Sequence, residues 1–232
     1  MSHTVIRRTE MVGASLNLGG QPLDLTEYST TGLMALAVGP RGFGKTNAGL
    51  LMAEQLSEQG WVSVLIDPEG ELESVYGAAV ADAEELRQRL TLRDVPIVVV
   101  SAKDALDFIP YGQVILEVAD ELRKPLFVCI DEGQLFSAAR KRADGVGEAC
   151  DIIAQFAERG RKRALDLFVT ALRYTGTLHR TMFSNPNLKL IGAQEDPTAW
   201  SALAPMFRSS GIEFKDLNAL GPGEFVLFSR RG

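Results

Sequence analysis

A glycine-rich segment at residues 39–46 limits the possible folds more than any other part of the chain. It reads Gly-Pro-Arg-Gly-Phe-Gly-Lys-Thr and matches the pattern G-x-x-x-x-G-K-[ST] at every fixed position. Residues 33–38 before it form an apolar run suited to a buried strand, and residues 47–59 after it place apolar side chains at helical spacing. Strand, glycine loop and helix in this order predict a loop that wraps a phosphate group at the amino end of a helix.

Each residue type in this loop has a use in binding a nucleoside triphosphate. Glycines let the backbone approach an anion closely, so that N–H groups and the positive end of the helix point at the phosphates. We expect Lys45 to contact the β- and γ-phosphates and the hydroxyl of Thr46 to bind the Mg²⁺ that bridges them. The residues predicted to contact the nucleotide are Gly39, Arg41, Gly42, Phe43, Gly44, Lys45, Thr46 and Asn47.

Strand-like and helix-like patterns alternate along the rest of the chain. The predicted core strands are residues 33–38, 61–66, 97–100, 126–130, 165–170 and 189–191. The predicted helices are residues 47–59, 82–90, 113–122, 148–159, 176–183 and 198–207, the last packed on the core. This alternation predicts an α/β fold with a mostly parallel sheet and helices on both faces, and it places the loops that follow the strands at one edge.

Length and composition favour one α/β domain. The chain has 232 residues, of which 46% are hydrophobic, and we expect an ATPase core over residues 33–232. Residues 1–32 are predicted to be an extension of short strands or loop, and residues 225–229 a terminal edge strand. No long apolar run or signal peptide is visible, so we expect a cytoplasmic protein without stable membrane insertion. Two cysteines and two histidines are too few and too scattered to suggest a metal centre.

Two acidic residues follow the apolar strand at residues 126–130. Asp131 is placed to hold Mg²⁺ through its coordinated water, and Glu132 to orient and deprotonate an attacking water. This pair favours hydrolysis over phosphoryl transfer to another substrate. Asp67 and Glu71 follow the second strand in a turn with a proline and a glycine; either binds water or metal, or the segment is an ordinary acidic turn.

Net charge is −6, which argues against a surface that coats nucleic acid indiscriminately. Positive residues nevertheless gather at 140–142 and 159–163. Each group is either a solvated surface or a functional patch. If the chain handles DNA, Arg140, Lys141 and Arg142 are the candidates for contacts to the phosphate backbone.

Four motifs in order resemble the HerA/FtsK superfamily of ring-forming DNA-pumping ATPases, and the HerA branch most closely. They are GPRGFGKT at 39–46, IDPEGE at 66–71, VCIDE at 128–132 and ERGRK at 158–162. The resemblance implies a RecA-like P-loop core that hydrolyses ATP with Mg²⁺ as a homo-oligomeric ring, a hexamer or pentamer, on double-stranded DNA. It also implies that Arg161 is a finger inserted into the neighbouring subunit's site, where a guanidinium stabilises charge on the γ-phosphate.

The chain resembles a bare motor core, similar to the genome-packaging ATPases of tailless, membrane-containing viruses. That reading implies capsid or portal-vertex proteins as partners, and a location in the host cytoplasm or the virion. The alternatives are a cellular HerA-like helicase or conjugation motor subunit, and a nucleotide-dependent assembly switch.

One departure from the family concerns the sensing of the γ-phosphate. Members carry a glutamine just after the fourth core strand, whereas here the stretch reads Thr170-Ala171-Leu172-Arg173. We consider Thr170 as its replacement, and Arg173 as a sensor or second finger.

Overall fold

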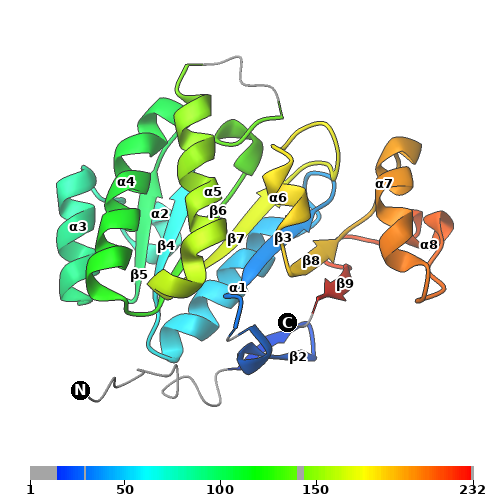
Figure 1. The fold of residues 1–232 in the computed structure, drawn as a ribbon, viewed down its shortest axis with the longest axis horizontal. Helices are drawn as coiled ribbons and strands as arrows, with labels where there is room; N and C mark the ends of the chain where they lie inside the picture. The colour runs from blue at the N-terminus through cyan, green and yellow to red at the C-terminus, as the bar shows by residue number, and fades with distance from the viewer. Residues whose placement is uncertain (1–14, 29, 140–143, 231–232) are drawn as a thin grey trace, which may run out of the picture.

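The computed structural model describes residues 15–28, 30–139 and 144–230. Its centre is a seven-stranded sheet in the order β5-β4-β6-β7-β3-β8-β9 (Figure 1). All neighbouring pairs are parallel except β8 and β9, which are antiparallel. The strands are β3 (Met34–Val38), β4 (Val62–Asp67), β5 (Ile97–Ser101), β6 (Leu126–Ile130), β7 (Leu165–Ala171), β8 (Leu188–Ile191) and β9 (Val226–Ser229).

Helices cover both faces of this sheet, which confirms the predicted α/β class (Figure 1). One face carries α3 (Ala83–Leu92), α4 (Ala105–Leu122) and α5 (Val146–Arg163), and the other carries α1 (Lys45–Glu58). A hairpin of β1 (Ser15–Leu18) and β2 (Gln21–Asp24), followed by η2 (Leu25–Tyr28), packs beside α1. The shorter helices are α2 (Glu73–Tyr76), η3 (Gly133–Leu135), α6 (Thr181–Ser184), α7 (Pro197–Phe207) and α8 (Phe214–Asn218).

The central strand β3 shows how the sequence divides between the two cores. Met34, Leu36 and Val38 face the core under α3, α4 and α5, and the intervening Ala35 and Ala37 face α1. The small alanines allow α1 to lie close to the sheet, since successive strand residues point to opposite faces. Gly49 of α1 also allows the helix to lie close to the sheet, because a Cβ at this position would lie 2.7 Å from the sulfur of Cys129.

Two predicted helices differ from the observed ones. Helix α4 begins at Ala105 rather than at residue 113, with Asp104 as its N-cap accepting the Asp107 N–H and with Pro110 inside the helix. Residues 176–183 are mostly not helical, and only α6 forms near their end. Instead, Leu178 forms an antiparallel bridge with Ala138, so this segment pairs with the chain that follows β6.

Helix α7, which comes late in the chain, packs on the core beside β8, as predicted. The rings of Trp200 and Phe207 stack with centroids 6.2 Å apart. On β8, the Nζ of buried Lys189 lies 3.7 Å from the sulfur of Met206 and 5.5 Å from the centre of the Phe228 ring. Burial, with a smaller contribution from Arg230, lowers the pKa of Lys189 to about 8.

Candidate nucleotide-binding site

The sheet order brings the glycine loop and the acidic pair to the same edge. The loop leaves the carboxyl end of β3, and Asp131 leaves the carboxyl end of β6, with only β7 between the two strands. Because parallel strands end at a common edge, residues far apart in sequence meet there. The remaining site residues come from the ends of β7 and β8.

The loop at residues 39–46 has the backbone that its glycines permit. Gly42 and Gly44 have φ values of 73° and 83°, in the left-handed region that glycine adopts without strain, and α1 begins at Lys45. Gly39 lies close to Gly192 after β8, since a Cβ on Gly39 would lie 3.4 Å from the Gly192 Cα. Because α1 begins directly after Gly44, the N–H groups of its first turn adjoin the loop, as phosphate binding requires.

Lys45 is held inside this loop. Its side chain is only 5% exposed, and Nζ donates a hydrogen bond to the Pro40 carbonyl oxygen at 2.9 Å. Burial lowers the pKa of Lys45, while the nearby carboxylates of Glu132 and Asp131 act in the opposite direction. The ammonium thus lies between the loop and the acidic pair, where the terminal phosphates of a nucleotide would meet it.

Thr46 and Asp131 meet directly across the site. The Thr46 hydroxyl lies 3.0 and 3.1 Å from the two carboxylate oxygens of Asp131. A hydroxyl and a carboxylate beside a phosphate-binding loop are the oxygen ligands that suit Mg²⁺, which keeps water and phosphate oxygens as its other ligands. Among the described residues there is no group of three or more His, Cys, Asp or Glu that could hold a metal ion. The site fits Mg²⁺ bound together with a nucleotide.

Thr170 at the end of β7 anchors the acidic pair. Its buried hydroxyl donates to Asp131 Oδ1 at 2.6 Å and accepts the N–H of Glu132 at 2.9 Å. The hydroxyl is therefore used within the protein, and this geometry favours a role in positioning the pair over contact with a phosphate. Of the two residues considered in place of the missing glutamine, Arg173 is the exposed one.

Glu132 has an unusual backbone for a residue with a side chain. Its φ of 46° lies in the left-handed region, which costs free energy and is common at functional sites. The next residue, Gly133, lies where there is no room for a side chain, because a Cβ there would lie 2.3 Å from Val169 Cγ1. The amide of Gln134 in η3 donates a hydrogen bond to Glu132 Oε2.

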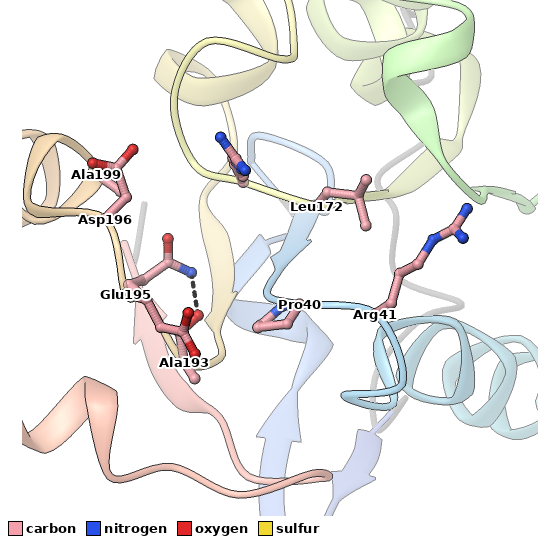
Figure 2. A pocket seen from close by; sticks show the side chains of 9 residues that line it. Pro40, Arg41, Leu172, Ala193, Glu195, Asp196 and Ala199 are labelled. Atoms are coloured by element: carbon pink, nitrogen blue, oxygen red, sulfur yellow. Dashed lines mark hydrogen bonds between the residues drawn. The ribbon is translucent and has the colours of Figure 1, made fainter.

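Two cavities flank the loop on its outer sides. One, of about 570 Å³, adjoins the first turns of α1 and is also lined by the β1–β2 hairpin, β8, β9 and the chain before β9. The other, of about 450 Å³, lies over the start of the loop; Figure 2 shows Pro40 and Arg41 on one side of it and Glu195 and Asp196 on the other. Leu172 and Arg173 also line this second cavity, so the stretch after β7 does reach the nucleotide loop.

The turn after β4 is a structural feature. Asp67 is 3% exposed, and its carboxylate accepts the N–H groups of Glu69, Gly70 and Leu72 at 3.1, 3.0 and 2.8 Å. These bonds use the carboxylate to shape the turn, which favours the ordinary acidic turn over a metal or water site. Glu71 is exposed.

The position of Arg161 on the backbone is informative although its side chain lies outside the described part of the chain. It belongs to the last turn of α5, directly before β7 begins, and therefore to the edge of the sheet opposite the glycine loop. The backbone at Arg161 therefore does not adjoin the glycine loop of its own chain. Arg140, Lys141 and Arg142 also lie outside the described residues.

The glycine loop contacts the carboxyl-terminal segment, and this contact was not predicted from the sequence. The Gly223 N–H donates to the Phe43 carbonyl oxygen at 3.0 Å, and a Cβ on Gly44 would lie 3.7 Å from the Gly223 Cα. The available signal was the sequence Gly221-Pro222-Gly223, directly before the strand predicted at residues 225–229. The carboxyl-terminal segment thus forms part of the site.

No helix among the described residues has the length and apolar character needed to cross a membrane. Neither a protein-family model nor a curated protein sequence matches the chain.

Solved structures do share its fold. The genome-packaging NTPase B204 from Sulfolobus turreted icosahedral virus 2, in complex with ATP-gammaS, is similar with a TM-score of 0.66 and 14% identity, over 86% of this chain and 93% of that chain. VirB4 of Thermoanaerobacter pseudethanolicus is similar with a TM-score of 0.65 and 11% identity, over 94% of each chain. The pCW3 conjugation coupling protein TcpA is similar with a TM-score of 0.64 and 15% identity, over 91% of this chain and 60% of that chain. The chain therefore has the RecA-like α/β fold of P-loop ATPases.

Proposed function

We propose that the chain is an ATP-hydrolysing, ring-forming motor that moves double-stranded DNA, and that its biological role is viral genome packaging. ATPase activity is inferred from one observation: the Thr46 hydroxyl contacts the Asp131 carboxylate, beside Glu132 and the buried Lys45. The likeness to B204, described as a genome-packaging NTPase, supports the packaging role.

The nucleotide is proposed to lie along the glycine loop with its base in the cavity of about 570 Å³. Backbone N–H groups at the start of α1 would hold the phosphates, and Lys45 would exchange its bond to Pro40 for the β- and γ-phosphates. The base would then point toward β8 and β9 and away from Asp131. Ala48 and Leu51 offer apolar surface to it in this cavity.

Hydrolysis then depends on Glu132. Thr46 and Asp131 would hold Mg²⁺, which when bound neutralises charge on the β- and γ-phosphates. Glu132 accepts the proton of the water that attacks the γ-phosphorus, and Arg161 from the neighbouring copy stabilises the charge that develops. Because each site needs a residue from the next copy, hydrolysis requires an oligomer, and a closed ring gives every site such a neighbour.

The first experiment measures the ATPase rate with no DNA, with duplex DNA and with single-stranded DNA, on protein whose mass is determined in the same buffer. We expect an oligomer with nucleotide and a rate raised by duplex DNA. A rate indifferent to every form of DNA, without an oligomer, contradicts the motor.

The second experiment tests Arg161 by mixing subunits. Arg161→Ala and Lys45→Ala subunits should each be inactive alone, but a mixture should regain activity at interfaces where an intact Lys45 site meets an intact Arg161. Lys162→Ala, a change at the next and exposed position, serves as the matched control and should keep full activity. Mixtures that stay inactive argue against a finger that acts on the neighbour.

The third experiment tests DNA contact by residues 140–142. Changing Arg140, Lys141 and Arg142 together to Ala should reduce DNA-stimulated turnover and leave basal hydrolysis intact. Changing the exposed Lys103 and Lys124 to Ala is the control for loss of positive charge elsewhere. Loss of basal hydrolysis would instead assign the loop a structural or catalytic role.

The likeness to the conjugation coupling protein TcpA favours a second candidate, a cellular HerA-like helicase or conjugation motor subunit. A nuclease partner recovered with the protein would support it. An assembly switch, suggested by the absent glutamine, predicts slow turnover and no displacement of a triplex-forming strand from duplex DNA.

A further inference from the structure

Gln134 contacts Glu132, but neither the motifs nor the proposed mechanism gives this glutamine a use. It lies in the single turn η3, whose backbone is fixed at both ends. Leu135 N–H donates to the Glu132 carbonyl oxygen at 2.9 Å, and the N–H groups of Phe136 and Ser137 donate to the Gly133 carbonyl oxygen at 3.2 and 2.9 Å. Phe136 and Ser137 are both fully buried, so the turn is anchored in the core.

The two ends of the Gln134 amide have different surroundings. Nε2 donates to Glu132 Oε2, whereas Oε1 is buried and has no hydrogen-bond partner among the residues that the structure describes. A buried acceptor without a partner lowers stability. Methionine has nearly the same shape without this cost, so packing alone does not account for a glutamine here.

Glu132 is thereby held at two points. Its backbone N–H donates to Thr170 Oγ1 at 2.9 Å, which fixes the strained backbone. The Gln134 amide fixes the far end of the side chain through Oε2. In the described part of the chain Oε1 of Glu132 accepts no hydrogen bond, so it is the oxygen left to take a proton.

We propose that Gln134 is a positioning residue for hydrolysis, which holds the Glu132 carboxylate so that Oε1 faces the attacking water. A glutamate side chain has three rotatable bonds, and fixing them before the reaction removes an entropic part of the barrier. This role rests on the proposed function, in which Glu132 is the general base. Because Gln134 acts through Glu132, it affects turnover and leaves nucleotide binding unchanged.

The test compares wild type with Gln134→Met, which keeps the shape but loses the donor. We expect kcat about tenfold lower, as for loss of one hydrogen bond in the transition state. KM and the Kd of a fluorescent ATP analogue should stay within about twofold, and the melting temperature should be equal or higher. Gln134→His, which restores an N–H donor, should recover part of kcat, and Leu135→Ala in the same turn is the control.

A double-mutant cycle shows whether Gln134 acts through Glu132. In a Glu132→Gln background, Gln134→Met should cause no further loss of the residual rate, whereas an independent structural role would add its full effect. If Gln134→Met does not fold, Gln134→Glu replaces it; there a second carboxylate faces Glu132, and kcat should fall further than tenfold.

The outcomes separate the two proposals. A wild-type rate in Gln134→Met overturns the role of Gln134 and leaves the ATPase intact. A parallel rise in KM and Kd, or an additive loss in the Glu132→Gln background, also overturns it. Absence of hydrolysis in the wild type refutes the proposed function and this role with it.

Discussion

Replacing Thr170 by valine tests whether its hydroxyl anchors the acidic pair. Valine has the same shape, so the change removes only the hydroxyl, which is fully buried in the native protein. Two hydrogen bonds are lost: the donation to Asp131 Oδ1 at 2.6 Å and the acceptance of the Glu132 N–H at 2.9 Å. Asp131 retains the hydroxyl of Thr46, whereas the Glu132 N–H has no other hydrogen-bond acceptor among the described residues.

The magnitude follows from these two bonds. A hydrogen bond to a charged group contributes about 1.5–3 kcal/mol, and a buried N–H left unpaired costs about 1–3 kcal/mol. Since Thr46 compensates in part, we expect the free energy of unfolding to fall by about 3 kcal/mol, or the melting temperature by about 6–12 °C for a chain of this length. The ATPase rate should fall about tenfold or more, because the base loses its backbone anchor.

Urea unfolding with an unchanged m-value measures the loss of stability. Thr170→Ser is the matched control: it keeps the hydroxyl, loses one buried methyl, and should cost about 1 kcal/mol with little loss of ATPase activity. The reasoning is refuted if Thr170→Val unfolds within about 0.5 kcal/mol of wild type, or if the serine variant loses as much activity as the valine variant.

Three further changes test other parts of the site and fold. Gly133→Ala should destabilise the protein by about 1–3 kcal/mol in urea unfolding, because its Cβ would lie 2.3 Å from Val169 Cγ1, whereas Gly221→Ala, where the nearest atom is 3.5 Å away, should be mild. Lys45→Met should leave the melting temperature without nucleotide equal or higher, since burial disfavours the ammonium, but abolish the rise caused by Mg²⁺ and ATP; an undiminished rise contradicts the role of Lys45. The pKa of Lys189 is about 8 in the folded protein, below its usual 10.5, so the free energy of unfolding should increase as pH rises from about 8 to 10.5. Lys189→Met should be more stable than wild type at pH 7 and lack this increase, and equal pH profiles for the two proteins would contradict it.

The core strands could be predicted from sequence because buried parallel strands form continuous apolar runs. Strand β6 was predicted with its observed bounds, Leu126–Ile130, and β3 within one residue. The helix predicted at residues 176–183 was wrong because local pattern carries no information on pairing with a distant segment, here the bridge between Ala138 and Leu178. Asp67 illustrates the same limit, since the sequence does not distinguish a carboxylate that binds three backbone N–H groups from one that binds a metal.

The site shows most clearly that a local sequence pattern does not reveal which distant residues come together. Asp131 and Glu132 were predicted because they are adjacent in sequence and follow an apolar strand. Thr170 lies 39 residues from Asp131 and is brought to it by the parallel register in which Ile130 pairs with Val169. A motif records residue types at fixed spacing, so it identifies the groups expected to touch phosphate and gives no role to Thr170 and Gln134, which contact Asp131 and Glu132. Sheet order brings Thr170 to the acidic pair, whereas Gln134 reaches Glu132 through a local turn, and the double-mutant cycle on Glu132 is the measurement that tests whether Gln134 acts through it.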